Sequence, residues 1–419
     1  MFPAGTPLSP SAAQDLSAAR ARKEVIAEEV KVRHGKEPNA HLHALRVVGR
    51  LLSVPPVALP KRADRPTAIY AGRTGESKGD VSMRAAVFKE KGVLKVEDIP
   101  DPVVGPRDVL LKVTHCAICG SDLHRYSHGM LRPGAILGHE YSGTVADKGT
   151  EVDAFQIGER VVRSGGKINP WHDVHPYPPR FSAKERGFLT TTRPGAYAEY
   201  FVTDADLLMR IPDSVTNLEA ALVEPLCVGL HAVRLSRLRL GDQTLIIGAG
   251  PIGLLAQQCA ALSGASQVFV SEGNAARRAV ALALGAAGVF DPTRSPLEEA
   301  ILRRTGLGVD VAFECAGARS TFHEATQAVR GGGQVVVVSL SWEPVYCLPV
   351  DWVAREVEIK AVYGSRAGEW PMAMALLEQR KVQVQPMISA LVSLDDIQAA
   401  FQELLKPDTD WVQAVVAFE

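Results

Sequence analysis

A glycine-rich turn between two apolar segments is the strongest constraint on the fold of this chain. Residues 244–247 form an apolar run of strand length, the sequence Gly-Ala-Gly-Pro-Ile-Gly follows at 248–253, and residues 252–262 have the length and composition of a helix. In this context the first glycine permits a tight turn, the second lets the backbone approach a pyrophosphate, and the third lets the helix pack closely on the strand. The helix N-terminus adds the positive end of its dipole. The pattern predicts a dinucleotide site formed by Gly248, Gly250, Pro251, Ile252 and Gly253.

Strand and helix patterns alternate around and after this turn. Apolar runs of strand length alternate with helix-like segments in the order 268–271, 275–284, 309–313, 321–329 and 334–340. Such alternation favours a parallel sheet with helices on both faces. We therefore predict a doubly wound α/β domain over residues 213–356.

One acidic residue bears on the choice of cofactor. Glu272 follows the second predicted strand of this domain, 19 residues after Gly253. An acidic side chain at this place accepts hydrogen bonds from the adenosine ribose hydroxyls and repels a 2′-phosphate, which favours NAD. Arg277 and Arg278 follow on the next predicted helix and could meet a 2′-phosphate, so NADP stays an alternative.

Residues 83–212 have a different pattern. Short strand-like runs separated by Gly and Pro turns lie at 84–88, 93–96, 109–114, 143–145, 160–162 and 198–202. Residues 412–418 again resemble a strand, which indicates that the chain end rejoins this β-rich block. We predict one β-rich domain made of residues 83–212 and 357–419.

The first 82 residues differ from both parts. They carry 13 Lys and Arg against 8 Asp and Glu, with helix-like patterns near 12–32 and 42–52 and a proline-rich connector at 55–60. This segment has too little apolar surface to fold by itself. We predict a partly helical or poorly ordered N-terminal extension.

The composition limits the possible partners. The formal net charge of −1 gives no reason to expect a nucleic acid or an anionic membrane surface. No run of 18 or more apolar residues is present, so no membrane span is expected. The six cysteines are scattered through a long chain, which is typical of a reducing compartment, and we expect the cytoplasm.

Potential metal ligands gather in the β-rich block. Cys119 and His139 are 20 residues apart and can converge from two sides of a loop. Thiolate and imidazole are good ligands for Zn²⁺, and a catalytic zinc site takes three protein ligands and leaves one position open. The third ligand must be acidic, Cys or His, and Glu140 and Glu224 are the candidates. Cys116 also forms a Cys-x-x-Cys pair with Cys119, but no second such pair exists to complete a four-cysteine site.

Four motifs occur in a fixed order: Cys119-Gly120-Ser121-Asp122-Leu123-His124, Gly138-His139-Glu140, Val223-Glu224-Pro225-Leu226 and the glycine-rich turn. Together they resemble the zinc-containing medium-chain dehydrogenase/reductase family, in its sorbitol, butanediol and threonine dehydrogenase branch. The resemblance covers about Met83 to the C-terminus. It implies an α/β plus β fold, in which a Rossmann domain is inserted into a GroES-like catalytic domain. It also implies an enzyme that transfers hydride between a small-molecule secondary alcohol or polyol and NAD, reversibly.

The resemblance implies roles for the potential zinc ligands. Cys119 and His139 match ligands that bind the ion directly, and Glu224 matches a position that supplies a further ligand. Glu140 matches a carboxylate that ligates directly in some members. Asp122 resembles the carboxylate that orients the imidazole of His139.

The resemblance also implies a proton path and a zinc count. Ser121 resembles the hydroxyl that takes the alcohol proton, and His124 resembles the relay to solvent. Many members carry a four-cysteine structural zinc lobe, but residues 164–194 contain no cysteine, so we expect one catalytic zinc and no structural zinc. By resemblance we expect a homodimer or homotetramer.

Two other interpretations stay open. The first is an NADP-dependent reductase of the same fold. The second is a non-catalytic nucleotide-binding scaffold that acts through the N-terminal extension. Bound zinc and alcohol-dependent NADH formation would separate an enzyme from a scaffold.

Overall fold

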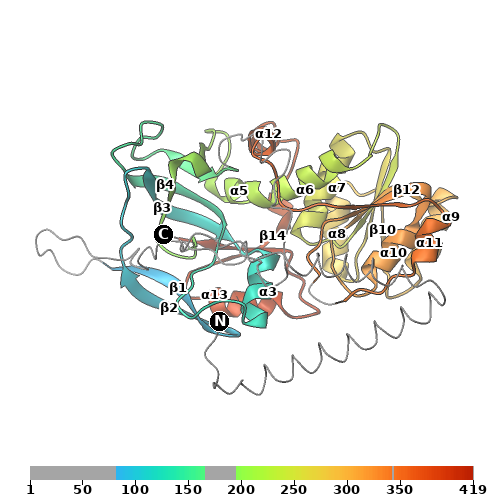
Figure 1. Cartoon of the computed structure of the whole chain (residues 1–419), viewed down its shortest axis with the longest axis horizontal. Helices are drawn as coiled ribbons and strands as arrows, with labels where there is room; N and C mark the ends of the chain where they lie inside the picture. Colours follow the sequence, from blue (N-terminus) through green and yellow to red (C-terminus); the bar gives the residue numbers. More distant parts are fainter. Residues whose placement is uncertain (1–81, 166–194, 342–343, 419) are drawn as a thin grey trace, which may run out of the picture. The chain divides into compact units, whose positions relative to one another are not determined.

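A computed structural model defines residues 82–165, 195–341 and 344–418 (Figure 1). The predicted N-terminal extension lies outside these residues except for Ser82. Most of the cysteine-free segment 164–194 lies outside them as well.

The second half of the chain contains a parallel sheet of six strands. Its order is β10-β9-β8-β11-β12-β13, and all neighbouring strands are parallel. The strands are β8 (Gln243–Ile247), β9 (Gln267–Ser271), β10 (Gly288–Phe290), β11 (Val309–Glu314), β12 (Val329–Val337) and β13 (Glu358–Ala361). The strand order reverses between β8 and β11, which is the topological switch point of a Rossmann sheet. The predicted doubly wound fold is confirmed.

Both faces of this sheet are covered. Ile246 and Phe313 pack into one core with residues of α6, α7 and α8, whereas Leu245 and Ile247 pack into another with residues of α9 and α10. The helices are α6 (Val223–Leu235), α7 (Pro251–Leu262), α8 (Ala275–Ala283), α9 (Leu297–Thr305), α10 (Thr321–Ala328) and α11 (Pro349–Val353). Side chains alternate along a strand, so burial on both faces explains the continuous apolar run of β8. Each such side chain contributes about 1.5–3 kcal/mol by leaving water.

The glycine-rich turn joins β8 to α7. Gly248 has φ +96°, a conformation that side chains disfavour. A Cβ on Gly253 would lie 1.9 Å from the carbonyl oxygen of Gly248, so only glycine lets α7 start this close to the strand. Gly250 is the N-cap of α7, and a Cβ there would meet nothing within 4 Å. The turn is therefore tightly packed at Gly253, and there is free space beside Gly250.

The second main sheet is mostly antiparallel. Its order is β14-β15-β3-β4-β5-β7, and β6 also pairs with β3. The strands are β3 (Asp108–Ala117), β4 (Glu140–Lys148), β5 (Arg160–Arg163), β6 (Tyr200–Asp204), β7 (Leu208–Arg210), β14 (Ile388–Val392) and β15 (Gln413–Ala417), and β1 (Ser82–Glu90) pairs with β2 (Val93–Pro100) in a separate hairpin. Val416 of β15 pairs with Cys116 of β3, so the chain end does rejoin the β-rich block.

Shorter elements complete the described chain. They are α3 (Gly120–His128), the 3₁₀ turn η2 (Ala205–Leu207), α5 (Asn217–Ala221), α12 (Glu369–Glu378), the 3₁₀ turn η3 (Gln385–Met387) and α13 (Ile397–Leu404).

One element differs from the sequence-based assignment. We expected residues from 357 onward in the β-rich domain, but β13 pairs with β12 and belongs to the six-stranded sheet. The helix after it, α12, packs against α6. β13 is short and partly exposed, so its sequence lacks the continuous apolar character that marks the other parallel strands. We propose that the return to the β-rich domain follows α12.

Candidate active site

A cavity of about 580 Å³ brings the predicted motifs together. Its lining residues come from α3, from the start of β4, from α6, and from the glycine-rich turn before α7. They include Cys119, Ser121, His124, His139, Glu140, Glu224, Gly250, Pro251 and Ile252. The predicted metal ligands therefore face the predicted dinucleotide turn across one cavity.

Local backbone features position the thiol and the imidazole. Cys119 is the N-cap of α3, and its Sγ accepts the backbone N–H of Ser121 at 3.4 Å. His139 follows Gly138, which has φ +99° and packs so tightly that a Cβ would lie 2.8 Å from the backbone nitrogen of Tyr197. A side chain at position 138 would push the His139 loop away from the cavity.

Three side chains converge as a metal site requires. One donor atom from each of Cys119, His139 and Glu140 lies within 4.8 Å of the others. Burial, and then the charge of Glu140, raises the pKa of the Cys119 thiol to about 11. Burial, and then the charge of Glu224, raises the pKa of Glu140 to about 8. A divalent cation would relieve this clash between buried anions, and the thiolate, imidazole and carboxylate set suits Zn²⁺.

The carboxylate of Glu140 also has spare coordinating capacity. Its Oε2 is buried and has no hydrogen-bond partner among the described residues. A buried acceptor of this kind is costly unless something satisfies it. A metal ion between Glu140, Cys119 and His139 would do so.

A buried carboxylate orients His139. Asp122 is fully buried, its Oδ1 lies 3.4 Å from Nδ1 of His139, and its Oδ2 accepts the hydroxyl of Tyr197 at 2.8 Å. Burial alone would lower the pKa of His139, but Asp122 and Cys119 raise it well above the usual value. With Nδ1 directed at Asp122, Nε2 is left to face a metal, which is the usual arrangement of metal-bound histidines.

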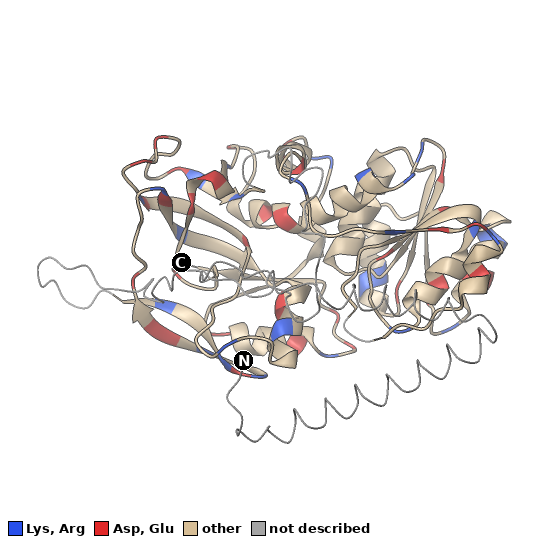
Figure 2. Cartoon of the chain, in the orientation of Figure 1, with Lys and Arg blue, Asp and Glu red and all other residues tan. Residues whose placement is uncertain are grey.

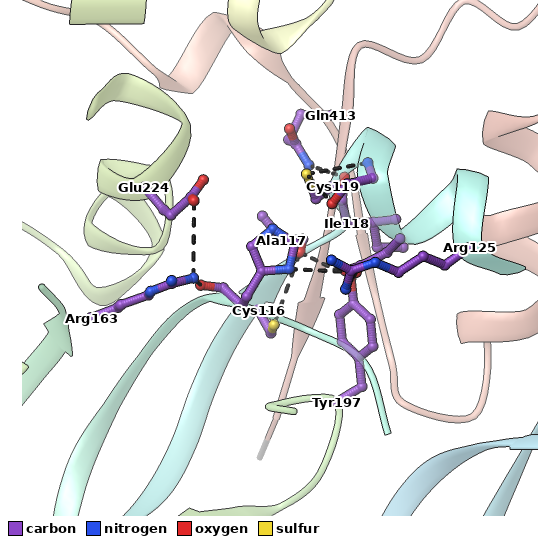
Figure 3. A network of polar contacts seen from close by, with 12 residues as sticks. Cys116, Ala117, Ile118, Cys119, Arg125, Arg163, Tyr197, Glu224 and Gln413 are labelled. Carbon is purple, nitrogen blue, oxygen red and sulfur yellow. Dashed lines mark hydrogen bonds and ion pairs between the residues drawn. The ribbon is translucent and has the colours of Figure 1, made fainter. Parts of the chain in front are cut away.

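Glu224 lies outside this cluster of donors. It lies in the first turn of α6, and its Oε1 forms an ion pair with Nη1 of Arg163 at 3.9 Å (Figure 3). The same nitrogen of Arg163 donates to the backbone carbonyl of His139 at 3.2 Å, and the guanidinium carbon lies 5.8 Å from the ring centroid of Trp370. Nothing in the spacing of the sequence marks Arg163, because its partners come from three separate elements.

The predicted proton-transfer residues both line the cavity. The hydroxyl of Ser121 donates to Sγ of Cys119 at 3.2 Å. Burial, and then the charge of His128, lowers the pKa of His124. His124 is therefore neutral near pH 7 and able to accept a proton.

The predicted ribose site lies beside the glycine-rich turn. The carboxylate of Glu272 accepts the backbone N–H of Ala249 at 2.9 Å and that of Asn274 at 2.9 Å. Arg277 donates instead to the carbonyl of Trp411 at 2.6 Å. Arg278 is also engaged, since it donates to the carbonyls of Glu272 and Gly273 and lies 3.0 Å from the carboxylate of Asp291.

Comparison with known proteins agrees with this geometry. Residues 105–213 match the family model of the alcohol dehydrogenase GroES-like domain, and residues 251–379 match that of zinc-binding dehydrogenases. The (R,R)-butanediol dehydrogenase of Bacillus subtilis (strain 168) is 33% identical over 341 residues, which cover 77% of this chain and 96% of that protein. The chain belongs to the zinc-containing medium-chain dehydrogenase/reductase family.

Further similarities place this dehydrogenase in the polyol dehydrogenase-like branch. The sorbitol dehydrogenase of Bos taurus is 34% identical over 321 residues, covering 74% of this chain and 90% of that protein. A solved structure of a putative zinc-binding dehydrogenase from Sinorhizobium meliloti 1021, bound to NADP, superimposes with a TM-score of 0.70 at 30% identity. The alignment covers 81% of this chain and all of that one. Because the relatives are dehydrogenases, this chain is an enzyme with alcohol or polyol dehydrogenase activity.

Among the described residues, no helix is both long enough and apolar enough to span a membrane. The cavity is also lined by Arg125 and Tyr363, which the motifs did not single out. Arg125 directly follows the motif that ends at His124, and this position beside the motif could have indicated it.

Proposed function

We propose that the dehydrogenase catalyses the reversible oxidation of a secondary alcohol or polyol to the ketone, with NAD as the hydride acceptor and one zinc ion. A single observation carries the proposal. The donor atoms of Cys119, His139 and Glu140 converge within 4.8 Å in the same cavity that the glycine-rich turn lines. Three ligands and an open position are the arrangement of a catalytic zinc site.

Glu140 is the third zinc ligand in this proposal. Its carboxylate is part of the cluster, whereas Glu224 is paired with Arg163. Glu224 then stays outside the donor set, but it is near enough for its charge to raise the pKa of Glu140. When bound, zinc would supply a Lewis acid for the alcohol oxygen, and the nicotinamide would supply the acceptor for the hydride.

The proton of the alcohol leaves through the protein. Ser121 stands next to Cys119 and accepts this proton while passing its own onward. His124, one helical turn further on α3 and neutral near pH 7, relays the proton toward solvent. General acid–base transfer of this kind contributes about 10²–10⁴-fold to the rate.

NAD is favoured over NADP by the ribose site. Glu272 accepts hydrogen bonds at the turn and would repel a 2′-phosphate. Arg277 and Arg278 would have to leave carbonyl partners to meet such a phosphate. A structural relative is bound to NADP, so the activity should be measured with both cofactors.

We infer one zinc ion per chain and an enzyme that assembles with copies of itself. The cysteine-free segment 164–194 supports a single zinc without a structural one. Figure 2 shows acidic and basic residues interspersed over the described ribbon, which supports an enzyme without nucleic-acid or membrane partners. The scattered cysteines of the sequence support a cytoplasmic location. The edge strand β13 exposes Ile359, which supports association into a homodimer or homotetramer.

The test uses the full chain loaded with zinc. NADH formation is followed by absorbance with diols, sugar alcohols and amino alcohols, and NADP is run in parallel. Cys119→Ser should lower turnover by orders of magnitude while NAD still binds. Full turnover by metal-free Cys119→Ser, or no turnover of any alcohol by the zinc-loaded protein, would refute the proposed function.

A further inference from the structure

Arg125 is a buried cation in the cavity that the proposed reaction does not use. It lies on α3 next to His124, its side chain is only 9% exposed, and it lines the cavity. Its Nε is buried and has no hydrogen-bond partner among the described residues. Because a buried guanidinium is costly unless its donors are satisfied, this side chain indicates a missing partner.

The nearest carboxylate only partly accounts for this cation. Nη1 of Arg125 lies 3.7 Å from Oδ1 of Asp122, which is an ion-pair distance and too long for a hydrogen bond. The same Oδ1 faces His139, and Oδ2 accepts the hydroxyl of Tyr197. Asp122 therefore balances part of the charge without a hydrogen bond to Nη1, and Nε still has no partner among the described residues.

The other charges around the cavity have partners of their own. Glu224 is paired with Arg163. Glu140 belongs to the proposed zinc cluster. Figure 3 shows the guanidinium of Arg125 reaching from α3 into the centre of the polar network. Tyr363 lines the same cavity as Arg125, and the guanidinium partly offsets the rise that burial causes in the pKa of Tyr363.

The chemistry of this donor set selects an anion. A guanidinium binds carboxylate and phosphate through two parallel N–H donors, and such charge-assisted bonds are about twice as strong as those to neutral groups. A neutral hydroxyl satisfies one donor and leaves uncompensated the part of the charge that Asp122 does not balance. The subsite beside the proposed zinc therefore fits an anionic group better than a further hydroxyl.

We propose that Arg125 binds an anionic group of the substrate, so that the preferred alcohols carry a carboxylate or a phosphate close to the carbinol carbon. The inference rests on the proposed function and narrows its substrate class. Arg125 acts here as a specificity-determining residue.

The experiment compares matched pairs of alcohols with the zinc-loaded full chain and NAD. One pair is 3-hydroxybutyrate against 1,3-butanediol, which differ at a carboxylate. The other is glycerol 1-phosphate against glycerol, which differ at a phosphate. The variants are Arg125→Met, Arg125→Lys and the control Arg132→Met, which removes an exposed cation from the following segment.

The wild type should favour the anionic member of at least one pair. Arg125→Met should lower kcat/KM for that member by about 10- to 100-fold, the loss expected for a charge-assisted hydrogen bond, and change the neutral member by less than about threefold. Arg125→Lys should recover part of the loss, and Arg132→Met should match the wild type. The pair that responds identifies carboxylate or phosphate as the group that binds.

Two results would overturn the inference while leaving the proposed function in place. One is wild-type oxidation of the neutral members with no preference for the anionic ones. The other is an equal loss on both members together with lower zinc content in Arg125→Met and normal behaviour of Arg125→Lys, which would assign Arg125 to the support of Asp122. Absence of turnover with every alcohol would instead refute the proposed function.

Discussion

The guanidinium of Arg163 lies 3.9 Å from the carboxylate of Glu224, at the edge of the proposed zinc site. This ion pair keeps a fourth potential ligand apart from the cluster of Cys119, His139 and Glu140. In Arg163→Met we expect Glu224 to enter the metal coordination and kcat/KM to fall by about 10- to 100-fold, the range seen when residues behind metal ligands are lost. Cobalt(II) substitution reports the change, because four- and five-coordinate cobalt differ in visible absorption.

The matched variants separate coordination from packing. Arg163→Lys should keep the wild-type cobalt spectrum, and adding Glu224→Gln to Arg163→Met should restore it. An unchanged cobalt spectrum in Arg163→Met would show that the ion pair with Arg163 is not what keeps Glu224 out of the metal coordination.

Two glycines of the turn should respond differently to the same substitution. A Cβ on Gly253 would lie 1.9 Å from a backbone oxygen, so Gly253→Ala should destabilise the fold by about 1–3 kcal/mol in chemical denaturation. A Cβ on Gly250 meets only open space and its φ is −74°, so Gly250→Ala should cost about 1 kcal/mol or less. That methyl group would instead occupy the approach of the pyrophosphate and weaken NAD binding by about 10-fold, measured by titration calorimetry. Equal effects of both variants on stability and binding would contradict the open side of the turn.

The pH dependence of oxidation should follow His124. This residue accepts a proton only when neutral, and burial followed by the charge of His128 lowers its pKa. The variant His128→Asn removes the charge of His128, which is one of the two causes of the lowered pKa. The pKa of His124 should then rise, so that its protonation begins at higher pH. The acid limb of kcat/KM for alcohol oxidation should then move to higher pH. A limb that stays in place in His128→Asn would exclude His124 as the group that limits the rate in acid.

A buried ion pair between α6 and α12 should contribute to stability in a pH-dependent way. Glu369 lies 2.9 Å from Nδ1 of His231 and 3.3 Å from Nε of Arg234. Burial alone would raise the pKa of Glu369, but hydrogen bonds from His231 and the backbone N–H of Arg366 lower it overall. Glu369→Gln should therefore destabilise the protein by about 2–4 kcal/mol at neutral pH.

The sign of the pH effect follows from the lowered pKa. The stabilisation by Glu369 is fully present above the unfolded pKa of about 4.5 and is lost as the pH falls through the lower folded value. Denaturation of wild type and Glu369→Gln should therefore converge in acid. Glu378→Gln, on an exposed position of the same helix, is the control and should match the wild type at each pH. A gap that persists unchanged below the folded pKa would point to packing rather than charge.

The sequence predicted those parts of the structure in which function restricts consecutive residues. The glycine-rich turn can be predicted from the sequence because its φ angles and close contacts allow few residue types. Cys119 and His139 were predicted from their residue types and their separation of 20 residues, and the structure brings donor atoms of both within 4.8 Å of each other. The two sheets followed from the alternation of apolar residues.

The parts that the sequence did not predict depend on contacts between distant elements. Arg163 ends β5 and meets Glu224 some sixty positions later, and a lone arginine carries no spacing signal. β13 was assigned to the wrong sheet because a short edge strand looks alike in a parallel and an antiparallel setting. Only the fold reveals such pairings.

The sulfur of Cys119 serves two structures at once. It caps the first turn of α3, and it is the thiolate that the proposed metal requires. Removal of the metal would leave this atom in place as a helix cap. Helix α3, which carries Ser121, His124 and Arg125, therefore keeps its first turn in the metal-free enzyme. Serine at this position retains an oxygen for the cap and alanine does not. Adding zinc back should therefore restore the active site, because helix α3 stays folded when the metal is absent.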